Sequence, residues 1–401
     1  MIKRFNIWML ILFALFLFCC RGPKTIILRD LSFLYASEKK VFLQAKVFRN
    51  NEKNFRLYFQ FMSLDKNIEH PDSVRAEYYI YDDLESGQVL FSDTLAVNAS
   101  ESGLFFFDIP VPEPHETVLE LSLSSESGNR LFFIEMNKQD RNAPENYLLL
   151  DLDKRPLIYN YFGEDQEVRV KTAHPEKELL WVYYYHRDFP IAQTPFHFEK
   201  RKPFNYRPDS IFSVKLEKGV SELIDLQQQG FYHILSDTSQ REGLTLFRFG
   251  EDFPEISTPE QMLQPLRYIS SSSEFEDLKS SDNTKMAVDK FWLELKGDEI
   301  RARNAIKSYY SSAEKANVYF SSYQEGWKTD RGLIYMIYGP PHKMNRGKGY
   351  ETWLYGRANS LNSIEFTFVQ VVNPFTQNDY QLIKSPKYKT SWYYSVDNIR
   401  R

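Results

Sequence analysis

The side chains best suited to catalysis or recognition lie in one segment near the end of the chain, residues 326–341, where charged residues lie among aromatic ones. Asp330 and Arg331 are adjacent there, and His342 follows directly. A catalytic site would use Asp330 together with Arg331 or His342. A recognition site would use Asp330 and Arg331 beside the neighbouring rings, because Trp, Tyr and Arg dominate binding hot spots and Arg offers a fixed fork to a carboxylate.

We favour a third interpretation, in which the residues of this segment mainly build the fold. Gly326 can end a preceding helix with positive φ, after which Trp327 packs back over that helix. Thr329 and Asp330 can form hydrogen bonds with the turn backbone, as these side chains commonly do in loops. Each residue of the segment then has a structural role.

The residues that follow predict a strand. Leu333–Tyr338 is apolar on both faces, which indicates a covered central strand. Gly332 would let the chain turn into it. Gly339-Pro340-Pro341 would close it, because proline donates no hydrogen bond to a neighbouring strand.

Residues 326–341 read Gly-Trp-Lys-Thr-Asp-Arg-Gly-Leu-Ile-Tyr-Met-Ile-Tyr-Gly-Pro-Pro. This run closely resembles the domain family named for its Gly-Trp-x-Thr-Asp motif, the GWxTD domain. The family pattern continues with a strand of the Tyr-x-x-Trp-x-Tyr type, which Tyr350, Trp353 and Tyr355 match. The resemblance implies that this part of the chain is a GWxTD domain.

The resemblance covers about residues 280–400 and includes an upstream Phe-Trp helix, matched by Phe291-Trp292. One departure is Lys296-Gly297-Asp298, where the family has an Arg-Asp-Pro-type stretch, and another is His342, where an acidic residue is common. The family is found in envelope lipoproteins of one bacterial group and has no established enzymatic activity. The resemblance therefore implies a noncatalytic envelope module.

A binding face on this module would combine the motif loop with nearby rings, because the aromatic residues supply more surface than a small core needs. The candidate binding residues are Gly326, Trp327, Thr329, Asp330, Arg331, Gly332, Tyr338, Gly339, Pro340, Pro341, Trp353 and Tyr355.

The rest of the chain carries no recognised catalytic arrangement. It has no glycine-rich phosphate loop, no Gly-x-Ser-x-Gly elbow and no His-Glu-x-x-His helix. His174, His186 and His197 could meet across strands, but we expect scattered polar surface rather than a metal site. The run Leu180–Tyr185 could be a sugar-binding platform, although a central strand covered on both faces is the simpler interpretation. We predict no catalytic residue, no cofactor and no metal.

The N-terminus predicts a bacterial lipoprotein. A basic start precedes the apolar run Ile7–Phe18, the pattern of a secretory signal peptide, and this run is too short for a comfortable membrane span. Leu17 stands three residues before Cys20, and the small Cys19 stands directly before it, as lipoprotein signal peptidase requires. We predict a signal peptide over residues 1–20 and a lipid on Cys20. The alternative is an uncleaved anchor with two accidental cysteines.

The predicted export signal also limits which disulfides, metal sites and partners the mature protein can have. Both cysteines lie at the predicted cleavage site, so the mature chain has no thiol for an internal disulfide or a cysteine metal site. In bacteria with the GWxTD family, surface-exposed lipoproteins resemble one another in an acidic run just after the cysteine. Residues 21–24 are Arg-Gly-Pro-Lys instead, so the resemblance implies the periplasmic face of the outer membrane rather than the cell surface. Export excludes nucleic acid as a partner. The membrane and an envelope protein are the expected partners, with a glycan as the other possibility.

Hydrophobic periodicity divides the chain into β and α+β parts. Residues 21–140 hold about seven short strands, among them the alternating Phe55–Phe61, and predict an Ig-like β-sandwich. A polar stretch at residues 139–144 separates a second set of strands at 145–253, for which we predict another sandwich.

From residue 259 the period becomes helical. Thr258 predicts an N-cap, residues 270–277 a connector, and Lys285–Leu295 and 298–324 two helices. Further strands are expected at 333–338, 350–355, 363–372 and 387–394. Helices packed on an antiparallel sheet would make residues 259–401 an α+β domain.

Two functional classes follow. We favour a noncatalytic lipoprotein that binds or scaffolds a protein or glycan partner at the outer membrane. The alternative is an enzyme acting on envelope polymers through Asp330, Arg331 and His342. Geometry discriminates between them, because an enzyme needs a cleft with convergent polar groups of perturbed pKa, whereas a binding module can show only an exposed aromatic patch.

Overall fold

The structure of the protein is a computed structural model that describes residues 29–36, 41–63, 72–82, 87–100, 103–110, 117–125, 128–136, 143–163, 166–198, 202–357, 360 and 363–401. The predicted signal peptide, Cys20 and residues 21–24 lie outside the described ranges, as does most of the predicted boundary at 139–144. No helix within these ranges is long and apolar enough to cross a membrane.

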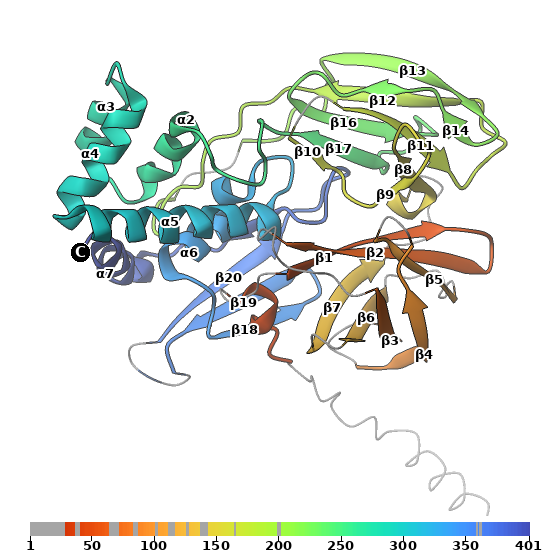
Figure 1. The fold of residues 1–401 in the computed structure, drawn as a ribbon, viewed down its shortest axis with the longest axis horizontal. Helices are drawn as coiled ribbons and strands as arrows, with labels where there is room; N and C mark the ends of the chain where they lie inside the picture. Colours follow the sequence, from red (N-terminus) through yellow and green to blue (C-terminus); the bar gives the residue numbers. More distant parts are fainter. Residues whose placement is uncertain are drawn as a thin grey trace, which may run out of the picture.

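The first β region packs two antiparallel sheets around one core (Figure 1). The apolar face predicted for Phe55–Phe61 is buried, and it shares this core with residues of the facing sheet, including Tyr78 and Ile80. The predicted β-sandwich is therefore present. Its sheets are, in spatial order, β1 (Val41–Arg49), β2 (Asn54–Ser63) and β5 (Phe105–Pro110), and β4 (Val89–Asn98), β3 (Ser73–Tyr81), β6 (Thr117–Ser125) and β7 (Gly128–Met136).

The second β region is one ladder of ten strands. Tyr147 and Phe162 lie in strands near opposite ends of the ladder but share one core, so the sheet curls over on itself. The spatial order is β10 (Tyr161–Phe162), β17 (Leu244–Arg248), β16 (Gly230–Leu235), β12 (Leu179–Tyr185), β13 (Ser210–Glu217), β14 (Val220–Ser221), β11 (Glu167–Thr172), β8 (Tyr147–Leu150) and β9 (Pro156–Leu157), with β15 (Ile224–Asp225) beside β11.

The run that could have been a sugar platform is the central strand β12, between β13 and β16. Leu180 and Val182 are fully buried on its inner face. Cover on both faces is incomplete, however, because Trp181 remains 38% exposed on the other face.

The C-terminal part is an α+β domain, as predicted (Figure 1). Its antiparallel sheet has the order β18 (Lys343–Gly347), β19 (Tyr350–Tyr355), β20 (Ile364–Gln370) and β21 (Tyr380–Leu382). Its helices are α2 (Pro259–Leu263), α3 (Ser272–Lys279), α4 (Thr284–Lys296), α5 (Glu299–Phe320), α6 (Asp330–Tyr338) and α7 (Lys389–Arg400), with short 3₁₀ turns at η3 (Gln264–Tyr268), η4 (Gly326–Lys328) and η5 (Pro386–Tyr388).

Local signals explain the helix ends. Thr258 caps α2 as predicted, because its side chain accepts a hydrogen bond from the backbone N–H of Gln261 in a capping box. Gly297 ends α4 with a φ of 78°, a conformation that glycine adopts without strain. The two helices predicted on either side of Gly297 are confirmed as α4 and α5.

Three predictions of local structure are wrong. Leu333–Tyr338 belongs to helix α6, residues 387–394 form η5 and the start of α7, and residues 270–277 contain most of α3 instead of a connector. Helix α6 is buried along most of its length, so its apolar run could not be told from a buried strand by periodicity. The signal overlooked in α3 was a capping box, in which Ser271 and Glu274 bond each other's backbone N–H.

A short segment near the N-terminus packs on the C-terminal domain, although the two are far apart in sequence. The 3₁₀ turn η1 (Ser32–Tyr35) lies beside β18, where Leu31 donates its backbone N–H to the carbonyl of Met344 at 2.7 Å. Asp30 accepts the backbone N–H of Met344 in return, at 3.1 Å. Leu31 and Tyr35 are buried in the same hydrophobic cluster as the GWxTD motif. This domain is therefore built from two separate pieces of chain.

Candidate functional site

At the GWxTD motif, the backbone at Gly326 and Gly332 lies so close to neighbouring backbone that no side chain would fit at either position. A Cβ added to Gly326 would lie 1.9 Å from the carbonyl oxygen of Ala316 in α5. One added to Gly332 would lie 1.9 Å from the carbonyl oxygen of Gly326. The positive φ predicted for Gly326 is wrong, because α5 already ends at Phe320 and Gly326 starts the turn η4. These glycines are needed for close approach, and Gly332 lies within α6 rather than at the start of a strand.

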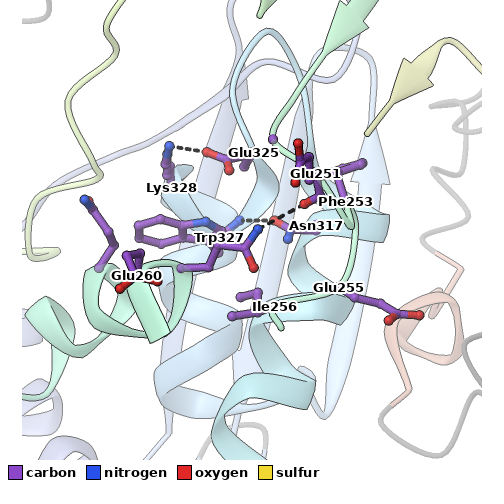
Figure 2. Close-up of a pocket in the computed structure, with 12 residues that line it drawn as sticks. Glu251, Phe253, Glu255, Ile256, Glu260, Asn317, Glu325, Trp327 and Lys328 are labelled. Carbon is purple, nitrogen blue, oxygen red and sulfur yellow. Dashed lines mark hydrogen bonds and ion pairs between the residues drawn. The ribbon is translucent and has the colours of Figure 1, made fainter. Parts of the chain in front are cut away.

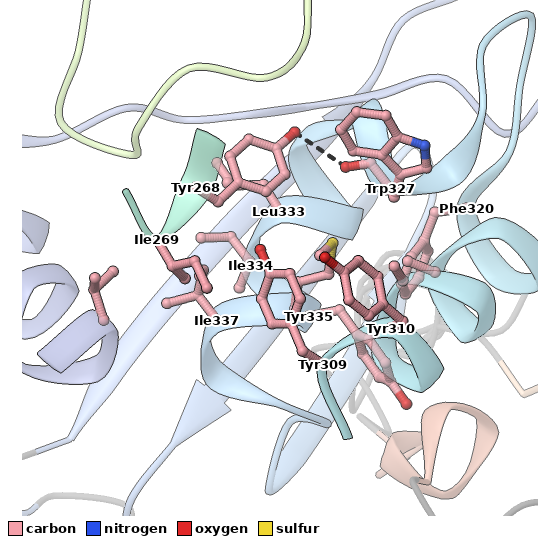
Figure 3. Packing of buried hydrophobic residues seen from close by; sticks show 14 of the residues in the cluster. Tyr268, Ile269, Tyr309, Tyr310, Phe320, Trp327, Leu333, Ile334, Tyr335 and Ile337 are labelled. Atoms are coloured by element: carbon pink, nitrogen blue, oxygen red, sulfur yellow. Dashed lines mark hydrogen bonds between the residues drawn. The ribbon is translucent and has the colours of Figure 1, made fainter. Parts of the chain in front are cut away.

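Trp327 contacts both helix α5 and the turn η3, and Figure 3 shows its bond with Tyr268 of η3. Its backbone N–H donates to Oδ1 of Asn317 at 3.2 Å, and its carbonyl accepts from the hydroxyl of Tyr268 at 3.0 Å. The side chain is 4% exposed. Trp327 therefore packs against α5, as the sequence predicted.

Thr329 and Asp330 take different roles. Thr329 caps α6: its hydroxyl donates to the carbonyl of Gly326 at 2.7 Å and accepts from the N–H of Gly332 at 3.1 Å. Asp330 does not bond the turn. Its carboxylate accepts the backbone N–H of Leu382 in β21 and pairs with the ammonium of Lys384, both at 2.9 Å. Asp330 thus ties α6 to the sheet.

Arg331 lies in a buried ionic network. Its guanidinium contacts a carboxylate oxygen of Glu351 at 3.2 Å and the carbonyl of Asn378 at 2.9 Å, and it stacks 4.1 Å from the ring centroid of Tyr380. The side chains of Arg331 and Glu351 are 2% and 0% exposed. Arg346 also reaches Glu351, at 2.6 Å.

The indole of Trp353 and the hydroxyl of Tyr35 complete the hydrogen bonds to Glu351. Burial alone would raise the pKa of Glu351, but the charges of Arg346 and Arg331 outweigh it and hold that pKa below its usual value. Burial raises the pKa of Tyr35 to about 12, so its hydroxyl stays protonated and donates. The carboxylate is therefore satisfied from within the protein.

These contacts overturn the exposed binding face expected around the motif. Trp327, Trp353 and Tyr355 are 4%, 0% and 7% exposed, so their rings belong to the core rather than to a surface patch. Arg331 offers no fork to a partner, because its guanidinium is already bound to Glu351. Tyr338 is only partly buried, and it packs on the rings of Tyr355 and Phe366. Gly339 ends helix α6 with a φ of 75°, so the Gly-Pro-Pro sequence at 339–341 closes a helix and not a strand.

The three residues of the enzyme hypothesis do not converge. Asp330 and Arg331 lie at the N-terminal end of α6, whereas His342 follows its C-terminal end, about 13 Å of helix away. His342 accepts the backbone N–H of Gly356 at Nδ1, at 2.8 Å. Each group is bound to a different part of the domain.

His174, His186 and His197, which could have met across strands, lie in the second β region. Within the described ranges, no group of three or more His, Cys, Asp or Glu residues is placed to hold a metal ion. His186 pairs with the carbonyl of Gln229, and His174 lies 3.5 Å from Glu176.

A pocket of about 270 Å³ lies beside the motif (Figure 2). Its walls come from the connection between β17 and α2, from the start of α2, from Asn317 in α5, and from Glu325, Trp327 and Lys328 of the motif turn. Three further glutamates line it: Glu251, Glu255 and Glu260. Lys328 forms an ion pair with Glu325, and its Nζ lies 5.3 Å from the centroid of the Trp327 ring.

Sequence reasoning missed every pocket residue except Trp327. Glu251, Glu255 and Glu260 precede the motif by 60 residues or more and follow no spacing that indicates a site. They meet Trp327 only because the β17–α2 connection folds back onto α5, where Asn317 donates to the carbonyl of Pro254 at 2.9 Å.

The fold and the motif define a protein with two β-rich regions followed by an α+β domain centred on a buried Gly-Trp-x-Thr-Asp turn. Residues 230–401 match the family model of the GWxTD domain, so this part of the chain belongs to the GWxTD domain family. The match begins in β16 and so includes the last two strands of the second β region. A comparison with curated proteins finds no match.

Solved structures resemble the chain only weakly. Alpha-2-macroglobulin of E. coli is 8% identical over 49% of this chain and 15% of its own, with a TM-score of 0.20. The titin fragment A168169 is 12% identical over 49% of this chain and 90% of its own, with a TM-score of 0.17. A putative membrane anchored protein from Corynebacterium diphtheriae is 13% identical over 55% and 61%, also with a TM-score of 0.17. Similarities of this size support no argument about function.

Proposed function

We propose that this protein is a noncatalytic lipoprotein of the outer membrane that faces the periplasm and binds an envelope protein through its C-terminal domain. The observation that carries the proposal is that two charged side chains of the motif segment, Asp330 and Arg331, already form ion pairs within the protein. Asp330 is paired with Lys384, and Arg331 with Glu351, so neither is free to act on a substrate. The motif residues stabilise the domain, and the partner binds to the surface beside them.

The proposed anchor suits this role. A lipid on Cys20 would hold the chain at the membrane, and several acyl chains suffice for stable anchoring where one is marginal. From residue 20 to residue 29 an extended chain spans at most about 30 Å. Because Leu31 and Tyr35 pack on the C-terminal domain, that domain would stay close to the bilayer.

Three experiments test the anchor, its orientation and the partner, in that order. Metabolic labelling with an alkyne fatty acid should mark the wild type and leave Cys20→Ala unlabelled. Equal labelling of both would refute the anchor. Proteinase treatment of intact cells should leave the protein whole, and rapid digestion would place it on the cell surface. Crosslinking of the lipidated protein in native membranes, followed by pull-down, should recover one predominant envelope protein.

The domain limits 21–140, 145–253 and 259–401 are part of this proposal. They are supported by separate hydrophobic clusters in the two β regions and the C-terminal domain. The segment around Tyr35 packs with the third cluster, and two smaller clusters join the first β region to the second and the second β region to the C-terminal domain. Limited proteolysis should cut first near residues 140–146, and early cleavage within α6 would contradict the division.

An enzyme acting on envelope polymers is the alternative class. Asp330→Asn separates the two. A loss of polymer turnover with folding and partner capture intact would establish the enzyme. A lower melting temperature without any change in turnover would support the noncatalytic role, because the neutral amide of the variant could no longer form the ion pair with Lys384.

A further inference from the structure

The N-terminal segment that packs on the C-terminal domain exposes an apolar ring close to the predicted anchor. In η1, Leu31 and Tyr35 are buried, whereas Phe33 between them is 41% exposed. The connection from Cys20 to Arg29 spans at most about 30 Å when extended. Because Phe33 follows so soon after this connection, it stays within reach of any bilayer that holds the lipid.

Hydrogen bonds at both ends hold this segment against the edge strand β18. The backbone N–H of Leu31 donates to Met344 at 2.7 Å, and the hydroxyl of Tyr35 accepts from the guanidinium of Arg346 at 3.0 Å. The segment therefore runs alongside β18 (Figure 1), and Phe33 lies between these two contacts. The exposed ring is thus fixed in position on the C-terminal domain.

The surface around this ring is basic, although the whole chain carries a net charge of −4. Residues 342–349, which contain β18 and the turn after it, hold three cations and no acid. Two of these cations, Lys343 and Lys348, are exposed, whereas Arg346 is bound to the buried Glu351.

The neighbouring acids do not cancel this charge. Glu120 is paired with Arg29. Asp30 accepts the backbone N–H of Met344 at 3.1 Å, and its charge offsets one lysine at most. Residues 21–28 of the sequence add two cations and no acid. The surplus is positive, which complements an anionic bilayer.

We infer that this surface, defined by Phe33, Lys343 and Lys348, docks on anionic lipid headgroups of the membrane that holds the anchor. The inference rests on the proposed anchor and adds which face of the C-terminal domain meets the bilayer. The ring of Phe33 enters the boundary between headgroups and acyl chains, and the two lysines lie against the headgroup charges. The lipid on Cys20 limits the distance of the domain from the bilayer, and the docked surface fixes its orientation.

The test uses the lipidated full chain in vesicles, with the environment-sensitive label nitrobenzoxadiazole attached to a new cysteine. The Phe33→Cys variant places the label, itself an apolar ring, on the proposed surface, and Ile300→Cys is the control. Once Cys20 is lipidated, the mature chain offers no other thiol. Ile300 is 75% exposed, and it lies about 30 Å of helix α5 away from Phe320, on which Tyr35 packs.

In phosphatidylcholine vesicles that contain a quarter phosphatidylglycerol, the emission of the label at position 33 should shift to the blue, and spin-labelled lipids should quench it. The label at position 300 should show neither effect. The shift at position 33 should be smaller in pure phosphatidylcholine and should shrink at high salt. No shift at position 33, equal shifts at both positions, or the same shift in neutral vesicles would overturn the inference.

Matched charge variants of the protein labelled at position 33 test whether the surface is defined. Lys343→Gln/Lys348→Gln should lower the ratio of docked to undocked protein about tenfold, because two charges are lost from the bilayer contact. Lys285→Gln/Lys290→Gln removes the same charge from exposed positions on α4 and should change that ratio by less than about 1.5-fold. Equal losses in both would show general attraction to the vesicle and refute a defined surface.

Alkyne labelling of Cys20 keeps this inference separate from the proposed function. If Cys20 carries the lipid and the label at position 33 stays in water, the docking surface fails while the anchor stands. If Cys20 carries no lipid, the anchor fails and this inference fails with it.

Discussion

The hydroxyl of Tyr35 lies 3.2 Å from a carboxylate oxygen of Glu351, 316 positions later in the chain, and both side chains are buried. The ring of Tyr35 packs edge-on against Phe320 and lies 5.4 Å from that of Trp353. Its carbonyl accepts a hydrogen bond from the hydroxyl of Tyr335 in α6. A segment that directly follows the predicted anchor thus completes the core and the ionic network of the domain at the other end of the chain.

Tyr35→Ala is expected to lower the free energy of unfolding of the C-terminal domain by about 3–5 kcal/mol, because it empties an aromatic site in the core. Tyr35→Phe keeps the ring and should cost only about 1–2 kcal/mol, for the lost hydrogen bonds to Glu351 and from Arg346. Urea unfolding followed by tryptophan fluorescence measures both. Equal stability of Tyr35→Ala and wild type would show that the N-terminal segment is dispensable.

Arg331→Met is expected to destabilise the domain by about 3–5 kcal/mol, because it leaves a buried carboxylate with fewer partners. The recognition site considered from the sequence would instead have left Arg331 available to a partner. In a double-mutant cycle, Glu351→Gln should recover part of the loss, since the two groups interact directly. Thermal unfolding of the four proteins checks this. Additive effects would mean that the ion pair contributes nothing.

Gly326→Ala is expected to cost at least about 3 kcal/mol, because the new methyl group would overlap the carbonyl of Ala316 in α5. Gly250→Ala is the matched control: a Cβ there meets nothing within 4 Å, and stability should change by less than about 0.5 kcal/mol. Melting temperatures compared side by side decide the matter. A stable Gly326→Ala protein would rule out close packing as the reason for the first glycine of the motif.

Acid is expected to destabilise the second β region through His233. Burial lowers the pKa of His233 to about 4, and the ring is held neutral, with Nε2 donating to the carbonyl of Arg241 and Nδ1 bonded to the hydroxyl of Thr245. The unfolded chain has the usual pKa near 6.5 and therefore binds more protons between pH 6.5 and 4. Stability should fall across that window by up to roughly 3 kcal/mol.

Urea unfolding at pH 7.5, 5.5 and 4.5 measures this fall. His233→Gln should be less stable at pH 7.5 but should lose less stability as the pH drops. An unchanged slope would assign the acid sensitivity to other groups.

Much of the fold could be predicted because its signals are local. Alternation along Phe55–Phe61 predicted a half-buried strand, and Thr258 and Gly297 marked helix ends through backbone chemistry that needs no distant partner. Helix α6 was mistaken for a strand because it is buried nearly all round, which removes the polar face that reveals a helical period.

In the candidate site, too, some features have local signals in the sequence and others depend on tertiary packing. The sequence alone identified the GWxTD domain and the position of its motif, and it predicts the lipid anchor at Cys20, because each of these signals lies in contiguous residues. It could not determine that Arg331 faces Glu351 rather than solvent, or that Glu260 lies beside Trp327. Those relations depend on how α5, α6 and the sheet pack, and packing is a sum over long-range contacts that no local pattern encodes. Tyr35 is the clearest case, since only the tertiary structure brings it to a carboxylate 316 positions away.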